Sequence, residues 1–347
     1  MFKYIVNFFV KRRKEFLLLF NVILYCFIIL ELVSRIILPD TVFHGQPMNK
    51  YGWILPANTL EIKTVIYSKD YIRNVTINYS NNGFKRWGNV DTNKTKLFIL
   101  GDSFTEMEYV SNGEEYYAYL EDTFNNLELF VLGIGGYSSL QEFMVLDYFF
   151  DIIKPDLILW QFSYNDYRSN LWAYEKKIFP FSANQIRPYL EGNKIVYRFP
   201  GPLNWLRKYS KFIDFLMERY QLLWKRSSSL SQFYGELKKK IDKKKVYAID
   251  RIEALNVTMN ILCMAKKRAG DIPFFLFSVD EIGSREKFIC SKANLTCIHG
   301  ISKYLNEKER AGINTTILDS GHWNVAGNEA VGRFLVDYFK NKSYFII

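Results

Sequence analysis

The feature that most constrains the fold is a regular alternation, from residue 96 onward, of short apolar runs with longer helical stretches. The apolar runs are short enough for strands buried on both faces, and they cover residues 96–100, 127–132, 156–162 and 273–279. The stretches with a helical period cover residues 114–124, 138–153, 248–268 and 325–339. Strands that alternate with helices predict a parallel sheet with helices on both faces. We therefore expect a three-layer αβα domain.

Length and composition are consistent with one large domain and an appendage. A single hydrophobic core stops growing at about 250–300 residues, and this chain has 347. The content of 49% hydrophobic and 17% aromatic residues is too high for a disordered chain. We predict one large domain at 96–347, an irregular lead-in at 39–95, and a basic tip with a transmembrane anchor at 1–38.

The membrane segment is predicted from residues 16–38, which are apolar apart from Asn21 in the first fifteen and Glu31 and Arg35 near the end. This is about the 20 residues that cross a bilayer. The basic cluster at 11–14 would stay in the cytoplasm, which places everything after residue 40 on the extracytoplasmic side. A cleaved signal peptide is the competing interpretation, although no small-x-small cleavage site follows the apolar run.

The net charge of +10 suits either a nucleic acid or an anionic surface. The sequence has no zinc finger, RNP-like motif or basic stripe with stacking aromatics, so we predict no nucleic-acid partner. Much of the excess lies at 11–14 and at 204–245, where 12 Lys/Arg face 4 Asp/Glu. Membrane proximity or an acidic polymer accounts for that distribution.

Two segments depart from the alternation. Residues 39–95 form an irregular lead-in in which 71–79 alternates like a strand and ends at the turn 81–83. Residues 168–247 are aromatic and Lys-rich, with Trp172, Trp205 and Trp224 among them. We expect this second segment to be a helical insertion that forms a cap, with a substrate-binding role and a purely structural one both open.

A candidate nucleophile follows the first predicted strand, in Gly101-Asp102-Ser103-Phe104-Thr105. A serine on a tight strand-to-helix turn presents its hydroxyl at the carboxyl edge of the sheet, where ligands of such sheets bind. Taken alone, Gly-Asp-Ser is also an ordinary turn or N-cap sequence.

A serine nucleophile needs a base, and the chain has three histidines, His44, His299 and His322. His322 stands just before the last helix, three residues after Asp319, so one loop can present both an imidazole and a carboxylate. Taken alone, Asp-x-x-His is as often turn and capping chemistry. The other two histidines are poorer candidates because of their neighbourhoods.

Acyl transfer also requires hydrogen-bond donors directed at the oxyanion. Backbone N–H groups are available at 133–136, a glycine-rich turn after the second strand, and Asn165 after the third strand offers a side-chain amide. Neither G-x-G-x-x-G nor a P-loop pattern is present, so this turn does not indicate nucleotide binding.

Together these four elements, in this order, resemble SGNH (GDSL-type) hydrolases over about residues 96–340. The resemblance implies the flavodoxin-like αβα fold of that family, with Ser103 as nucleophile, His322 as general base and Asp319 as its orienter. It also implies an oxyanion hole made of the Ser103 amide, the Gly136 amide and the Asn165 side chain. It implies no metal and no organic cofactor.

One departure concerns the family's Gly-x-Asn-Asp, which reads Ser163-Tyr164-Asn165-Asp166 here. The donor asparagine is kept, but the backbone of its loop is altered. We expect Asp102 and Asp166 to have structural roles in their loops.

The lead-in sequences at 51–53 and 82–84, together with the ending at 322–327, resemble those of bacterial membrane-anchored SGNH proteins. That resemblance implies an ester substrate on a cell-surface carbohydrate, most simply an O-acetyl group. A polysaccharide O-acetyltransferase would use the same triad, a lipase or peptidase is chemically open, and a non-catalytic glycan-binding or scaffold protein is the alternative of another class. The sequence does not indicate an oligomeric state.

Cysteine use is compatible with export. Cys26 lies in the apolar run and Cys263 in a helical stretch, whereas Cys290 and Cys297 enclose a short polar loop. The last two can pair in an oxidising compartment or remain free thiols.

Overall fold

The computed structural model describes residues 12–38, 50–68, 70–178, 187–198, 204–207, 209–226, 243–318 and 321–342. The chain divides into two compact units. The small unit comprises 1–45, 181–185 and 199–241, and the large unit comprises 46–180, 186–198 and 242–347.

The large unit is built on a six-stranded sheet with the order β10-β9-β6-β4-β5-β3. The strands are β3 (Arg86–Trp87), β4 (Thr95–Gly101), β5 (Leu127–Gly133), β6 (Leu157–Phe162), β9 (Phe274–Ser278) and β10 (Thr296–Ile298). All neighbours pair in parallel except β3, which is antiparallel to β5. In chain order the five parallel strands follow the 2-1-3-4-5 arrangement of flavodoxin-like sheets. The predicted fold class is confirmed.

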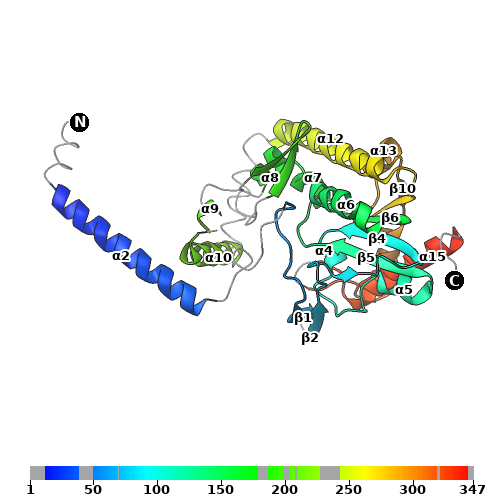
Figure 1. Ribbon diagram of the computed structural model, residues 1–347, viewed down its shortest axis with the longest axis horizontal. Coiled ribbons are helices and arrows are strands. Elements are labelled where there is room, and N and C mark those ends of the chain that lie inside the picture. Colours follow the sequence, from blue (N-terminus) through cyan, green and yellow to red (C-terminus); the bar gives the residue numbers. More distant parts are fainter. Residues whose placement is uncertain are drawn as a thin grey trace. The chain divides into compact units, whose positions relative to one another are not determined.

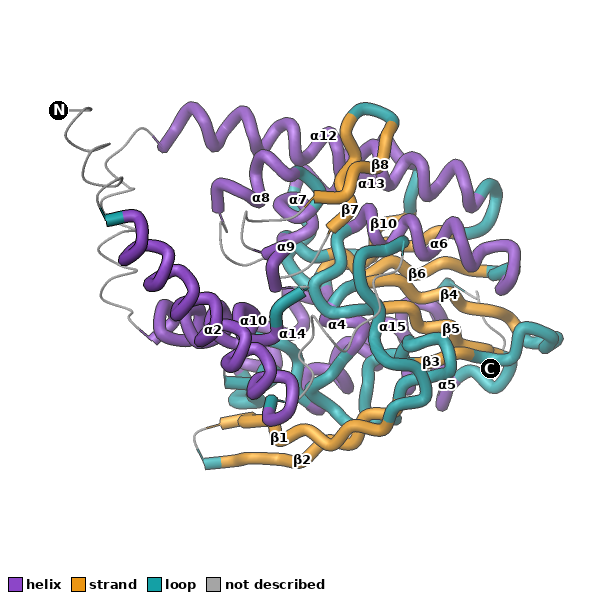
Figure 2. Tube along the Cα trace, turned by 60° about the vertical axis from the view of Figure 1, so that its left-hand side comes forward, coloured by secondary structure: helices purple, strands orange, loops and turns teal. Residues whose placement is uncertain are grey.

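Helices cover both faces of this sheet (Figures 1 and 2). On one face Phe98 and Leu100 of β4 pack with α6 (Ser139–Ile153), α12 (Lys243–Ala269) and α13 (Ser284–Ala293). On the other face Leu97 and Ile99 pack with α5 (Ala118–Thr123), α14 (Ile301–Arg310) and α15 (Val325–Asn341). Alternate residues of one strand therefore belong to opposite cores, as expected for a strand buried on both sides.

The predicted strands and helices of this domain are present, with different ends for two helices. The helix expected at 114–124 is shorter and consists of α5 alone. The residues before it form a loop, in which Glu114 accepts a hydrogen bond from the Ser111 amide and the Tyr116 amide donates to Asn328. The helix α12 begins five residues earlier than the predicted 248. Strands β3 and β10 and helices α13 and α14 were not predicted, since they are too short or too polar to give a clear period.

The lead-in forms a β-hairpin of β1 (Leu60–Ser68) and β2 (Tyr71–Asn78). Its inner face buries Val65, Val75 and Ile77 against Ile317. The strand predicted at 71–79 is confirmed, whereas its partner β1 was not predicted.

The segment expected to be a helical insertion also contains strands. Helix α8 (Trp172–Ile178) is followed by the hairpin of β7 (Arg187–Glu191) and β8 (Lys194–Arg198), and Trp172 packs edge-on against Tyr189 of this hairpin. The side chains of Trp205 and Trp224 are not described, and residues 227–242 of the basic stretch lie outside the described residues.

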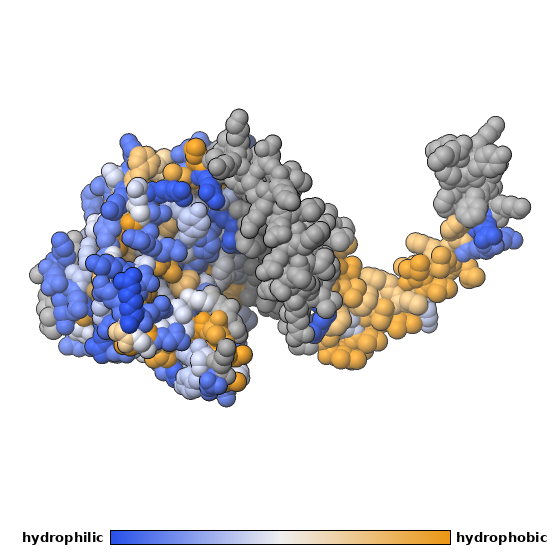
Figure 3. Space-filling view, turned by 180° about the vertical axis from the view of Figure 1, so that it is seen from behind, coloured by the Kyte–Doolittle hydropathy of each residue, from blue (hydrophilic) through white to orange (hydrophobic). Residues whose placement is uncertain are grey.

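The small unit contains α2 (Arg13–Ile37), α9 (Asn204–Arg207) and α10 (Lys211–Arg226). Residues Lys14–Ile37 of α2 are long and apolar enough to cross a membrane, with a mean hydropathy of 2.6 and apolar side chains exposed along the helix (Figure 3). Near its end, the Glu31 carboxylate accepts hydrogen bonds from the backbone amides of Lys211 and Phe212, both at 3.1 Å. Glu31 therefore caps the first turn of α10, because those amides have no partner within their own helix.

A disulfide joins Cys290 in α13 to Cys297 in β10, with 6.0 Å between the Cα atoms. Of the two states left open by the sequence, the structure has the bonded one. Cys26 and Cys263 are free thiols.

Candidate active site

The candidate nucleophile lies where β4 turns into the short helix α4 (Ser103–Glu106). Gly101 ends the strand with no room for a side chain, since an added Cβ would lie 2.3 Å from Thr105 Oγ1 and 2.4 Å from Gln161 Oε1. Asp102 caps α4 by accepting a hydrogen bond from the Phe104 amide at 3.0 Å. The structural role expected for Asp102 is confirmed. The turn leaves Ser103 half-buried at the carboxyl edge of the sheet.

Gln161 holds this turn from the neighbouring strand β6. Its Oε1 accepts hydrogen bonds from the Asp102 amide and from Thr105 Oγ1, both at 3.0 Å, and its side chain is fully buried. Sequence reasoning did not identify Gln161. A polar residue within an otherwise apolar strand was the signal that could have indicated it.

His322 is the histidine that the structure brings to Ser103. Ser103 Oγ and His322 Nε2 are 2.7 Å apart, which is a hydrogen bond. The centre of the His322 ring lies 4.5 Å from the ring centres of both Phe104 and Tyr109. An antiparallel β-bridge between Thr316 and Trp323 closes the loop that carries His322. His299 is exposed, and His44 lies outside the described residues.

Burial lowers the pKa of His322 below its ordinary value, while the charges of Asp102 and Glu108 act in the opposite direction. The lowered pKa favours the neutral imidazole at pH 7, and a neutral Nε2 can accept the serine proton. Asp319, the predicted orienter of this ring, lies outside the described residues.

The predicted oxyanion loop lies beside the nucleophile. A Cβ placed on Gly135 would lie 3.8 Å from Ser103 Cβ. Gly136 adopts a φ of +78°, in the left-handed region that favours glycine. Within the described part of the chain, neither the Ser103 nor the Gly136 amide donates a hydrogen bond, so both are available to a substrate oxygen.

Asn165 follows β6, on the other side of β4 from this loop, and opens helix α7 (Asn165–Ser169). Its Nδ2 donates to Asp102 Oδ2 at 3.2 Å, which uses one of its two hydrogens. The Ser163 hydroxyl lies 2.7 Å from the same carboxylate oxygen and is in contact with Asn165 Oδ1. The serine therefore orients the asparagine. Asp166 accepts from the Ser163 amide, which confirms its structural role.

Buried carboxyl groups surround the site without being part of the predicted constellation. Glu106, at the end of α4, is buried, accepts from Tyr79 Oη at 2.8 Å and contacts the Gly135 amide. Burial raises the pKa of Glu106, and it raises those of Glu142 and Asp166 well above their usual range. These groups favour their neutral forms more than exposed carboxyls do.

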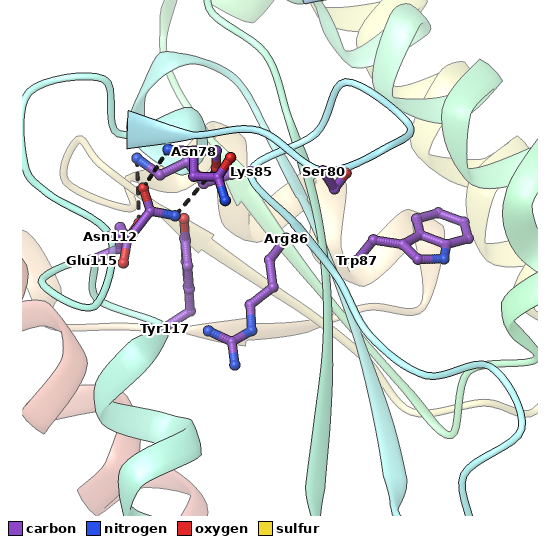
Figure 4. Close-up of a pocket in the computed structure, with 8 residues that line it drawn as sticks. All are labelled: Asn78, Ser80, Lys85, Arg86, Trp87, Asn112, Glu115 and Tyr117. Carbon is purple, nitrogen blue, oxygen red and sulfur yellow. Dashed lines mark hydrogen bonds and ion pairs between the residues drawn. The ribbon is translucent and has the colours of Figure 1, made fainter. Parts of the chain in front are cut away.

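A polar cavity of about 210 Å³ opens elsewhere in the large unit (Figure 4) and is lined by Asn78, Ser80, Lys85, Arg86, Trp87, Asn112, Glu115 and Tyr117. Inside it, Lys85 Nζ lies 3.3 Å from Glu115 and donates to the Met107 carbonyl at 3.0 Å. Met107 is the C-cap of α4. Lys85, held by its buried ion pair, therefore supports the end of the helix that follows the nucleophile. None of the predicted site residues lines the cavity.

Among the described residues, no group of three or more His, Cys, Asp or Glu side chains is placed to hold a metal ion. The site presents a hydroxyl, an imidazole, backbone amides and a carboxamide, and these groups suit covalent catalysis on an acyl group.

Comparison with solved structures finds GDSL lipolytic proteins and esterases over about 70% of the chain. Similar structures include a GDSL-family lipolytic protein from Veillonella parvula (10% identity, TM-score 0.38, 71% of this chain and 98% of that one). Esterase EstA from Pseudoalteromonas (12%, 0.40, 72% and 99%) and an acetyl-xylooligosaccharide esterase from Geobacillus (13%, 0.38, 72% and 94%) are also similar. No protein-family model and no curated protein matches the chain. The flavodoxin-like class follows from the strand order of the sheet itself.

Proposed function

We propose that this protein is a serine esterase that works through an acyl-enzyme on Ser103. The observation that carries the proposal is the 2.7 Å hydrogen bond between Ser103 Oγ and His322 Nε2, at a strand-to-helix turn at the carboxyl edge of the sheet. Ligands of flavodoxin-like sheets bind at that edge, beside the point where the strand order reverses. The reversal lies between β4 and β6, which carry Ser103 and Asn165 at their ends.

In the first half-reaction, Ser103 Oγ attacks the ester carbonyl carbon while its proton passes to His322 Nε2. The tetrahedral oxyanion accepts hydrogen bonds from the Ser103 amide, the Gly136 amide and one Nδ2 hydrogen of Asn165. Collapse breaks the bond to the leaving alcohol, and the imidazolium returns its proton to that oxygen. Water then attacks the acyl-serine through the same steps, with Asp319 as the group that orients the ring.

The substrate that we propose is an O-acetyl ester of a cell-surface carbohydrate. Its support is the sequence resemblance to membrane-anchored SGNH proteins. Transfer of the acetyl group to a glycan hydroxyl in place of water uses the same residues, and the two reactions differ only in which acceptor reaches the acyl-serine.

We further propose that α2 is an uncleaved anchor with the large unit on the extracytoplasmic side. The end of α2 is part of the folded small unit, because Glu31 caps α10 and Arg35 Nη2 donates to the Tyr209 carbonyl at 3.0 Å. A signal peptidase cutting after the apolar run would remove a partner from a formed helix. The disulfide between Cys290 and Cys297 is typical of an oxidising compartment.

The test is labelling of the full chain in detergent with a fluorescent organophosphonate, followed by hydrolysis of acetyl esters. We expect the wild-type chain to be labelled and to turn over, and Ser103→Ala and His322→Ala to lose both. A folded wild-type chain that neither labels nor hydrolyses any ester would contradict the proposal and favour the glycan-binding alternative. A labelled chain that turns over an acetyl donor only when a glycan acceptor is present, with the acetyl group recovered on the glycan and not as free acetate, would favour the transferase.

A further inference from the structure

The two glycines beside Ser103 are held by side chains from three separate parts of the sequence. The Gly135 amide donates to Glu106, and the Gly135 carbonyl accepts from Trp53 Nε1 at 3.3 Å. The Gly136 carbonyl accepts from Arg187 Nη1 at 2.7 Å. Three of the four backbone polar groups of this dipeptide are therefore bonded to side chains, and the fourth is the Gly136 amide of the candidate oxyanion hole.

Arg187 is itself rigidly held. Its side chain is 10% exposed, and Nη1 also donates to Gln141 Oε1 at 2.7 Å. Its Nε lies 3.4 Å from Glu175, and its guanidinium packs 5.1 Å from the centre of the Trp53 ring. Burying a guanidinium is costly unless it is paired, and here the pairing directs one N–H at the loop.

Arg187 belongs to the hairpin β7–β8, which interrupts the αβα pattern between α8 and α12. The other arginine of these two strands, Arg198, makes an exposed ion pair with Glu191 at 2.7 Å. One arginine of the hairpin thus contacts the loop beside the nucleophile, while the other lies at the surface.

We propose that Arg187 is a positioning residue for the oxyanion loop. By holding the Gly136 carbonyl, it fixes the orientation of the loop, together with Glu106 and Trp53, so that the Gly136 amide is directed at the oxyanion before substrate binds. The proposal rests on the proposed esterase function and adds to it a positioning role for the hairpin β7–β8. A preorganised donor costs no reorganisation when the oxyanion forms, so the benefit falls on the transition state.

The test compares Arg187→Lys and Arg187→Met with Arg198→Met, a matched control on the same hairpin. In the full chain we measure kcat and KM for an acetyl ester, the pH profile of kcat/KM and the rate of organophosphonate labelling. We expect both Arg187 variants to lose kcat, by about 10²-fold for the methionine, because small misplacements of catalytic groups have effects of that size. KM and the apparent pKa of His322 should stay at the wild-type values, and the Arg198 variant should match wild type in every measurement.

A second variant covers the case in which Arg187→Met does not fold. Trp53→Phe removes the Nε1 donor to the Gly135 carbonyl and keeps most of the ring, so it should lower kcat in the same way with KM unchanged. Wild-type kcat in folded Arg187→Lys and Trp53→Phe would overturn the proposal. A raised KM and a lowered kcat, together with a lower melting temperature, would also overturn the proposal, in favour of a purely structural arginine. If Ser103→Ala retained activity, the proposed esterase function itself would fail, which is a separate result.

Discussion

The two units of this protein both use a carboxylate to cap a helix, but they place apolar side chains in opposite surroundings. In the large unit the apolar strand residues are enclosed between two layers of helices, with Leu97 and Phe98 fully buried on opposite faces. In the small unit α2 exposes apolar side chains along most of its length, such as Leu18 at 67% and Ile36 at 82%. The large unit thus has the core of a domain that folds in water, whereas α2 requires apolar surroundings.

The carboxylates show what the units share. Asp102 caps the short helix that carries the nucleophile, and Glu31 caps α10. In each case the acid satisfies amides that a helix leaves without partners. A charge within an apolar run is costly in a membrane, and the hydrogen bonds that Glu31 accepts from α10 lower that cost. Chemistry should therefore be confined to the large unit and membrane attachment to the small unit.

The largest effect is expected from Ser103→Ala. Loss of the nucleophile should lower kcat by about 10⁴-fold or more, since removing a triad serine leaves only binding and oxyanion stabilisation. Fractionation of cells, followed by an esterase assay of each fraction, measures turnover and membrane attachment in one experiment. The variant should remain in the membrane fraction at the wild-type level.

The matched counterpart is deletion of residues 1–38. This chain should move to the aqueous fraction while it keeps its turnover of small esters. Full activity in Ser103→Ala, or a deletion chain still pelleting with membranes after a salt wash, would break the division between the units.

Breaking the buried ion pair behind the nucleophile turn should have the next largest effect. Lys85→Met leaves Glu115 buried without its cation, and we expect a loss of about 3–5 kcal/mol in unfolding free energy. The measurement is chemical denaturation of the deletion chain. The control Arg333→Met, which breaks an ion pair with side chains 64% and 42% exposed, should change stability by about 0–1 kcal/mol. Equal losses in the two variants would show that the buried pair is unimportant.

The fold was predictable because its signals are local and strong. Strands buried on both faces read as short apolar runs, and their alternation with helices allows few arrangements. Strands β3 and β10 have two and three residues, too few to show a period. The hairpin β7–β8 lies in a Lys-rich, aromatic segment where composition suggested helices, and its pairing depends on contacts with the rest of the fold.

The candidate site was predictable only in part. Ser103, Gly136, Asn165 and His322 follow strands or precede a helix, so their positions could be recognised along the chain. Gln161, Glu106 and Arg187 act through contacts between residues distant in sequence, and nothing in their immediate neighbours indicates a partner. Such contacts exist only once the layers are assembled.

The pH dependence should reflect His322 alone. The base must be neutral, and burial lowers its pKa below 6.5, so kcat/KM should be constant above that pKa and fall tenfold per unit below it. Glu108→Gln removes a charge that raises this pKa, so the acidic limb should move to lower pH. The control Glu329→Gln, at an exposed ion pair, should leave the limb in place. A limb that moved to higher pH in Glu108→Gln would contradict this assignment.

The smallest effect is expected from Glu31→Ala, which leaves the first amides of α10 without their acceptor. Loss of a helix cap costs about 1 kcal/mol, and opening of α10 should become about fivefold more frequent. Hydrogen exchange of residues 211–226, measured on the full chain in lipid nanodiscs, reports that opening directly. The control is Glu15→Ala at the other end of α2, where the carboxylate is 70% exposed and pairs with Arg12. Protection of α10 unchanged by Glu31→Ala would mean that the Glu31 carboxylate does not stabilise α10, and the case against cleavage would lose its main support.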